Sequence, residues 1–182
     1  NLGLFTYFMS RASNHVFAFE PNPYPLGNLK SLVDKNVTIL PIALGNSDGP
    51  IKIKIPHHEN GWSSNGASLS PRSEEPGKFI EIQCRKLDSL NINNIGLIKI
   101  DVEGFEIEVL KGAKETILRN KPTMIIENES VHTKDTNELF LIMHELGYNK
   151  YFCNSKSELK KIDDFSVEEH QLDSNNKDID YI

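Results

Sequence analysis

Apolar residues in the first fifty positions alternate between helical spacing and short continuous runs. Helical spacing predicts one helix from Leu4 to about Asn14 and a second over residues 26–33. Continuous apolar runs at 15–19 and 37–43 predict buried strands, each followed by turn residues. Helices that alternate with apolar strands are typical of a parallel sheet with helices on both faces.

The middle of the chain breaks this alternation. Residues 51–55 read Ile-Lys-Ile-Lys-Ile, and residues 79–85 alternate more loosely, so both segments predict half-exposed strands. We expect the two to pair as an antiparallel arm at about 51–85. Between them, residues 60–73 are rich in Gly, Ser and Asn, which favours either a functional loop or a flexible linker.

The α/β pattern returns in the second half of the chain. Apolar runs predict buried strands at 97–102 and 123–126 and the start of another at 148–152. A single helix is expected over about 105–120, where a following proline ends it, and a further helix runs from a cap at Asp135 to Gly147. The pattern as a whole predicts one doubly wound, mostly parallel α/β domain.

Composition and charge narrow the class of protein. A chain of 182 residues with 38% hydrophobic and 25% charged residues fits one soluble domain. The formal net charge of -6 argues against a nucleic-acid partner, and no apolar run is long enough to span a membrane. Cys84 and Cys153 have no metal-type spacing, so reduced structural thiols and a cytoplasmic location are the default expectations. The oligomeric state is left open.

The carboxyl ends of the predicted strands are where an open parallel sheet binds its ligand. Glu20 ends the first strand, where an acid can accept hydrogen bonds from both ribose hydroxyls of a nucleoside. It can equally be a solvated turn residue. Asn1 and Gly3 precede the first helix, where free amides favour a carboxylate or phosphate and glycine permits close approach. A tight strand-to-helix turn explains that glycine as well.

The strand at 97–102 contains charged residues that suggest a functional site. Alternation places Lys99 and Asp101 on one face of a strand that helices should cover on both sides. Buried charges are costly unless they are paired or face a site. The pair is therefore either a structural ion pair or part of a functional site, and Glu106 and Glu108 suit the positive start of the following helix.

Several of these segments resemble one known family in the order in which they occur. Residues 97–106, Leu-Ile-Lys-Ile-Asp-Val-Glu-Gly-Phe-Glu, with Val-Leu-Lys-Gly-Ala at 109–113, closely resemble the most characteristic stretch of FkbM-family methyltransferases. Residues 1–6 resemble the back half of that family's first motif, and 17–22 and 41–45 resemble the ends of its second and third strands. The likeness continues through 85–88 and 125–127. The likeness extends to about Phe152.

The resemblance implies a seven-strand class I methyltransferase sheet that binds S-adenosylmethionine. Glu20 would hold the ribose, and Ala43 and Leu44 would flank the adenine. The residues expected to line the cofactor are, along the chain, Asn1, Gly3, Glu20, Ala43, Leu44 and Asp101. The acceptor implied is a hydroxyl on a sugar, glycolipid or natural product.

Methyl transfer to a hydroxyl points to a carboxylate as the proton acceptor. Asp101 and Glu103 are the first candidates for this base, with Glu127, His57 and His58 behind them. No third ligand stands at a suitable spacing from the two histidines, so no metal site is expected.

Two alternatives remain at this point. An NAD-dependent oxidoreductase also places an acid at the end of its second strand, and Gly3 could end its glycine fingerprint. Against it, residues 101–104, Asp-Val-Glu-Gly, have no counterpart in that fingerprint. The other alternative is a non-catalytic domain that keeps the fold for partner binding.

The chain opens at a helix start with no strand before it. The resemblance therefore implies a domain over 1–182 that lacks the first strand and the opening of the first motif. The end of the last strand is the other segment that a fragment could lack. In a class I sheet that strand is central. We expect a gap one strand wide, about 4.8 Å per spacing, between the strands that end at Glu20 and Asp101, and a chain that is unstable by itself.

Overall fold

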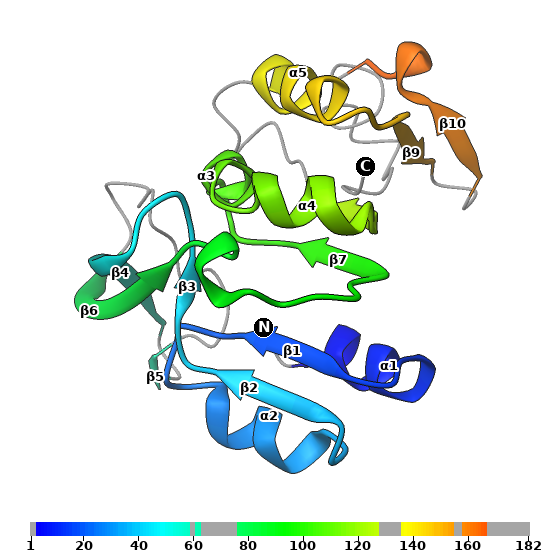
Figure 1. The fold of residues 1–182 in the computed structure, drawn as a ribbon. Helices are drawn as coiled ribbons and strands as arrows, with labels where there is room; N and C mark the ends of the chain where they lie inside the picture. Colours follow the sequence, from blue (N-terminus) through cyan, green and yellow to red (C-terminus); the bar gives the residue numbers. More distant parts are fainter. Residues whose placement is uncertain (1–2, 59–60, 63–75, 128–135, 155–157, 167–182) are drawn as a thin grey trace. The chain divides into compact units, whose positions relative to one another are not determined.

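The computed structural model describes residues 3–58, 61–62, 76–127, 136–154 and 158–166. By their internal contacts the residues form two compact units, Asn1–Lys86 and Leu87–Ile182. Figure 1 shows the helices and strands of both units.

The first unit begins with the expected alternation of helices and strands. Helix α1 (Leu4–Ala12) leads into β1 (Val16–Phe19), and α2 (Leu26–Leu32) leads into β2 (Val37–Leu40). The two strands are parallel and in register from Val16 opposite Val37 to Phe19 opposite Leu40. The two helices flank this ladder (Figure 1). The predicted βα pattern at 1–40 is therefore confirmed.

The strand predicted over 37–43 ends earlier than expected. Pro41 has no N–H to donate to a ladder, and the chain turns there, with the amide of Ile42 bonded to the carbonyl of Leu40 (2.9 Å). Ala43–Leu44 then form a separate strand, β3, which pairs in parallel with the arm. The expectation that β2 continues to Ala43 is wrong for this reason.

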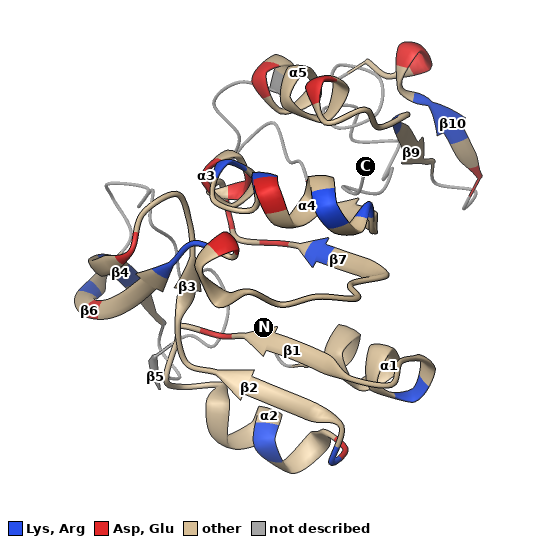
Figure 2. Cartoon of the chain, viewed as in Figure 1, with Lys and Arg blue, Asp and Glu red and all other residues tan. Residues whose placement is uncertain are grey.

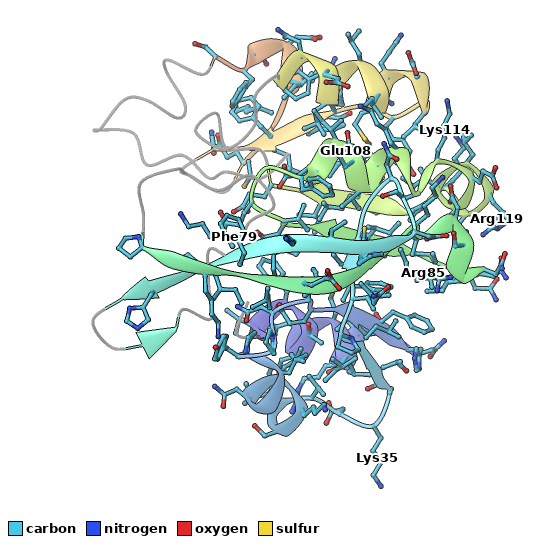
Figure 3. All side chains as sticks on the ribbon, turned by 90° about the vertical axis from the view of Figure 1, so that its left-hand side faces the viewer. Lys35, Phe79, Arg85, Glu108, Lys114 and Arg119 are labelled. Carbon is cyan, nitrogen blue, oxygen red and sulfur yellow. The ribbon has the colours of Figure 1, made fainter. Side chains whose placement is uncertain are left out.

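The antiparallel arm is confirmed and is longer than predicted. It consists of β4 (Gly49–His58) and β6 (Gly77–Arg85), with a short strand β5 (Gly61–Trp62) paired to the tip of β4. Alternate side chains of the arm are buried together as one core cluster, which is made of Ala43, Ile53, Ile55, Ile82 and Cys84. The opposite face is exposed, and Phe79 lies on it (Figure 3). Most of the Gly/Ser/Asn-rich segment lies outside the described residues.

The second unit has its own parallel ladder. After a 3₁₀ turn at Asp88–Leu90, β7 (Leu97–Ile100) pairs with β8 (Thr123–Ile126) in the register that sets Ile100 opposite Ile126. Strand β8 has the predicted bounds. Both ladders end on their predicted acids, because Glu20 follows β1 and Asp101 and Glu127 follow β7 and β8.

The helix expected over 105–120 is two helices. Helix α3 (Glu106–Lys111) ends at Gly112, and α4 (Lys114–Asn120) begins after Ala113. The carboxylate of Asp88 accepts the amides of Thr116 (2.7 Å) and Glu115 (3.2 Å), which satisfies two of the free donors at the start of α4. A distant acid therefore supplies a second helix start that spacing alone cannot reveal.

The unit closes with α5 (Thr136–Glu145), the antiparallel pair β9 (Tyr151–Cys153) and β10 (Leu159–Lys161), and a 3₁₀ turn at Ile162–Asp164. Helix α5 ends at Glu145, two residues before the predicted stop at Gly147, whose φ is 81°. The proposed cap, Asp135, lies outside the described residues. The buried apolar side chains of this unit are Leu87, Ile100, Val109, Leu110, Ala113, Ile117, Ile126, Leu139, Met143, Leu146 and Phe152.

The mixed α/β class and the parallel pairs agree with the expected methyltransferase fold. In the described residues the ladders are β1–β2, β7–β8, β9–β10 and the sheet β3–β6–β4–β5. The full seven-strand order and the gap expected beside β1 stay predictions.

Candidate functional site

Glu20 follows β1 at the start of a tight turn. Its Oε1 accepts the backbone N–H of Asn22 (2.9 Å). The side-chain oxygen of Asn22, which is 1% exposed, accepts the N–H of Tyr24 (3.1 Å). Figure 2 shows the acidic position directly after the arrowhead of β1. The acid is thus held at the strand end, and its carboxylate also stabilises the turn, as the simpler interpretation of the sequence expected.

Gly3 is the residue before α1, and it needs to be glycine. Its φ is 87°, in the left-handed region, and its carbonyl accepts the N–H of Tyr7 (2.9 Å) in the first turn of the helix. A Cβ added there would overlap Cδ1 of Leu29, which is buried in α2. The backbone at this helix start is therefore closely packed. Asn1 lies outside the described residues.

Ala43 and Leu44 form β3 at the base of the arm. Ala43 is 6% exposed and belongs to the core cluster of the arm, whereas Leu44 is half-buried. The methyl group of Ala43 therefore packs inward, so Leu44 and the β3 backbone are the parts of this segment that could flank an adenine.

Lys99, Asp101 and Glu127 form one charged cluster at the ends of β7 and β8. Nζ of Lys99 makes an ion pair with Oδ2 of Asp101, and both side chains are largely buried, at 10% and 19% exposed. Asp101 also shares a hydrogen bond with Glu127. The amide of Glu127 donates to the carbonyl of Ile100 (2.9 Å), so the parallel register brings the two acids side by side. The predicted proximity of Lys99 and Asp101 is confirmed.

The surroundings of Asp101 lower its pKa. Burial alone would raise the pKa, because it penalises the charged carboxylate. The hydrogen bond with Glu127 and the hydrogen bond and charge of Lys99 act in the opposite direction and prevail. Asp101 is therefore ionised in neutral solution.

The turn after β7 places Glu103 in an unusual backbone conformation. Glu103 has a φ of 55° and Gly104 a φ of 92°, so two successive residues are left-handed. Oε1 of Glu106 accepts the amides of Val102 (3.3 Å) and Gly104 (3.1 Å) across this turn.

Sequence reasoning missed this contact and interpreted Glu106 only as a helix-start acid. The signal available to it was the spacing of an acid two and four residues after the amides of Gly104 and Val102.

The two histidines lie at the far end of β4. His57 is exposed, and its backbone N–H donates to the carbonyl of Pro76 (2.8 Å). No cluster of His, Cys, Asp or Glu suited to a metal ion occurs in the described part of the chain. Nor does any described helix have the length and apolar character needed to cross a membrane.

Comparison with protein families gives one match over most of the chain. The model described as "Methyltransferase FkbM domain" matches residues 2–150. Among curated proteins, the Hexuronic acid methyltransferase AglP of Haloferax volcanii is 29% identical over 145 residues. The match covers 76% of this chain and 57% of the relative, so the chain corresponds to little more than half the length of that protein.

A solved structure shares the fold. The crystal structure of Methyltransferase FkbM from Methylobacillus flagellatus KT superposes with a TM-score of 0.55 at 18% sequence identity. The superposition covers 79% of this chain and 34% of the other. At this identity the likeness concerns the arrangement of helices and strands.

Proposed function

Because the chain belongs to the FkbM methyltransferase family, we propose that it transfers a methyl group from S-adenosylmethionine to an oxygen of a sugar-type acceptor. The observation that carries the proposal is the ionised Asp101, held beside Lys99 at the end of β7 in the segment that most resembles the family. Its position at a strand end is where an open α/β sheet presents its chemistry.

The residues at the other strand ends have the chemistry that the methyl donor requires. The carboxylate of Glu20 can accept hydrogen bonds from ribose hydroxyls, and the left-handed turn at Gly3 sets the main chain at the start of α1 that would approach the methionine portion. Leu44 and the backbone of Ala43 would flank the adenine, and Asn1 would complete the helix start.

Bound S-adenosylmethionine supplies a methyl group already activated on a sulfonium sulfur. The chain's own residues have to align the acceptor behind that group, and positioning of this kind supplies about 7–11 kcal/mol of the barrier. The bound group would supply an electrophilic methyl carbon, whose bond to sulfur would break as the acceptor oxygen bonds to it, with the electron pair left on sulfur. Asp101 or Glu103 takes the hydroxyl proton.

A sugar acid is the acceptor class that we favour. The relative from Haloferax volcanii is named for hexuronic acid, a sugar that offers both hydroxyl and carboxylate oxygens. A hydroxyl has to lose its proton during transfer, whereas a carboxylate has none to lose. The need for a base therefore distinguishes the two kinds of acceptor oxygen.

Methyl transfer from labelled S-adenosylmethionine to uronic acids and to neutral sugars tests this proposal in the full-length gene product. With a hydroxyl acceptor, Asp101→Asn or Glu103→Gln should lower kcat by about 10²–10⁴-fold, the usual contribution of a general base. With a carboxylate acceptor the same variants should retain most of their activity. Absence of transfer to any sugar would refute the acceptor class.

The sequence left two alternatives, an NAD-dependent oxidoreductase and a non-catalytic domain of the same fold. Membership of a methyltransferase family removes the reason for preferring an NAD-dependent oxidoreductase. A non-catalytic domain of the same fold is the outcome that the assay reveals if the protein binds S-adenosylmethionine and transfers nothing.

A further inference from the structure

Glu106 is a buried carboxylate that the chemistry proposed above does not use. It is 3% exposed although it is the first residue of α3. Its Oε1 accepts two backbone amides, and the described residues offer no hydrogen-bond donor to Oε2. A charged group is costly to bury unless it is hydrogen-bonded, so the two amides are what holds this carboxylate in place.

The two amides belong to the turn that carries Glu103. Val102 and Gly104 are the residues immediately before and after Glu103, and both donate to the same oxygen of Glu106. A left-handed conformation at a residue other than glycine is strained and persists only where its surroundings impose it. The carboxylate of Glu106 therefore clamps the strained residue from both sides.

We propose that Glu106 is a positioning residue that fixes the turn at 101–104, so that Asp101 and Glu103 keep the places required for methyl transfer. It acts through the backbone amides of Val102 and Gly104. The proposal rests on the proposed function, because the two carboxylates are its reason. A displacement of about 1 Å at a reacting group can lower the rate about 10²-fold, so loss of the clamp should be seen in kcat.

Three variants separate the clamp from other roles of an acid. Glu106→Gln keeps a carbonyl oxygen for the same two amides, whereas Glu106→Met fills a similar volume and accepts nothing. Glu108→Gln is the matched control, because Glu108, which is labelled in Figure 3, lies in the same helical turn but is half-exposed. Its Oε1 pairs with Nζ of Lys111 (3.3 Å).

The kinetic test uses the full-length gene product. Glu106→Met should lower kcat by about 10²-fold while its dissociation constant for S-adenosylmethionine stays within about threefold of the wild type. Glu106→Gln should recover most of the lost kcat, and Glu108→Gln should match the wild type. Wild-type kcat in Glu106→Met would overturn the proposal. So would a Glu106→Gln variant as slow as Glu106→Met, since the charge rather than the accepting oxygen would then matter.

Amide hydrogen exchange tests the clamp without a measurement of enzyme activity. The amides of Val102 and Gly104 should be protected in the wild type and in Glu106→Gln, and they should exchange at least about tenfold faster in Glu106→Met. Equal protection in all variants would refute the clamp even if the enzyme is active. If the wild type transfers no methyl group but its exchange follows this pattern, the proposed function fails and the clamp stands. Should Glu106→Met not fold, Glu106→Asp replaces it, because it keeps the charge and withdraws the oxygen by one methylene.

Discussion

At the residue scale, the ion pair between Lys99 and Asp101 combines stability with the proposed chemistry. Asp101→Asn removes the charge that pairs with the largely buried ammonium of Lys99. Breaking one side of a buried pair is expected to cost about 3 kcal/mol of unfolding free energy, the lower end of the usual range. Denaturant unfolding measures the loss. The double variant Lys99→Met, Asp101→Asn should lose less than the two single variants added together, and strict additivity would show that the pair is not coupled.

The same carboxylate makes the stability of the fold depend on pH. The pKa of Asp101 is lowered in the folded chain, so its stabilising contribution is fully present above the ordinary value of 3.8 and is lost as pH falls through the folded value. The difference in unfolding free energy between wild type and Asp101→Asn should therefore be constant near neutral pH and shrink below about pH 4. Unfolding curves at a series of pH values test this, and a difference that grows on acidification would contradict it.

The sequence predicted which side chains lie together where strand alternation alone determines the face on which they lie. Lys99 and Asp101 meet because residues two apart in a strand share a face. The burial of Glu106 was not predictable, because it depends on a turn with two left-handed residues. Only its spacing from the amides of Val102 and Gly104 was visible in the sequence. The partnership of Asp101 with Glu127 requires the register of two strands, which no local pattern contains.

At the scale of elements, the start of α1 depends on a glycine that a larger residue cannot replace. Gly3→Ala would strain a left-handed position and push against Leu29, so we expect a loss of about 1–3 kcal/mol in unfolding free energy. Gly27→Ala is the matched control, since no atom lies within 4 Å of its added Cβ and it lies inside α2. That control should be neutral or stabilise by up to about 1 kcal/mol. Equal effects of the two changes on thermal unfolding would show that the packing of Gly3 is unimportant.

Apolar periodicity predicted the types of the helices and strands, but it did not always predict where they end. The arm follows from strict alternation at 51–55, and β8 has its predicted bounds. The break of β2 at Pro41 was readable from the missing amide, but the pairing of β3 with the arm is a long-range contact. The division between α3 and α4 depends on Asp88, which is distant along the chain.

At the scale of the whole molecule, the described part of each compact unit contains a two-stranded parallel ladder, β1–β2 in the first and β7–β8 in the second. Parallel strands are normally buried in larger sheets, and a strand edge with free amides and carbonyls favours pairing with another chain. We therefore predict that the 182-residue chain alone unfolds without a sharp transition and self-associates as its concentration rises. Light scattering and thermal unfolding check this. A stable monomer with one cooperative transition would contradict it.

The central claim is that this chain provides the S-adenosylmethionine site of a methyltransferase, with Glu20 on the ribose. Calorimetric titration of the full-length gene product with S-adenosylmethionine and, separately, NAD tests it most directly, with Glu20→Ala beside the wild type and the exposed arm variant Glu81→Gln as control. We predict binding of S-adenosylmethionine and not of NAD, a loss of about 1–3 kcal/mol in Glu20→Ala, and no change in the control. Binding of NAD in place of S-adenosylmethionine, or an affinity for S-adenosylmethionine that Glu20→Ala leaves unchanged, would contradict the account.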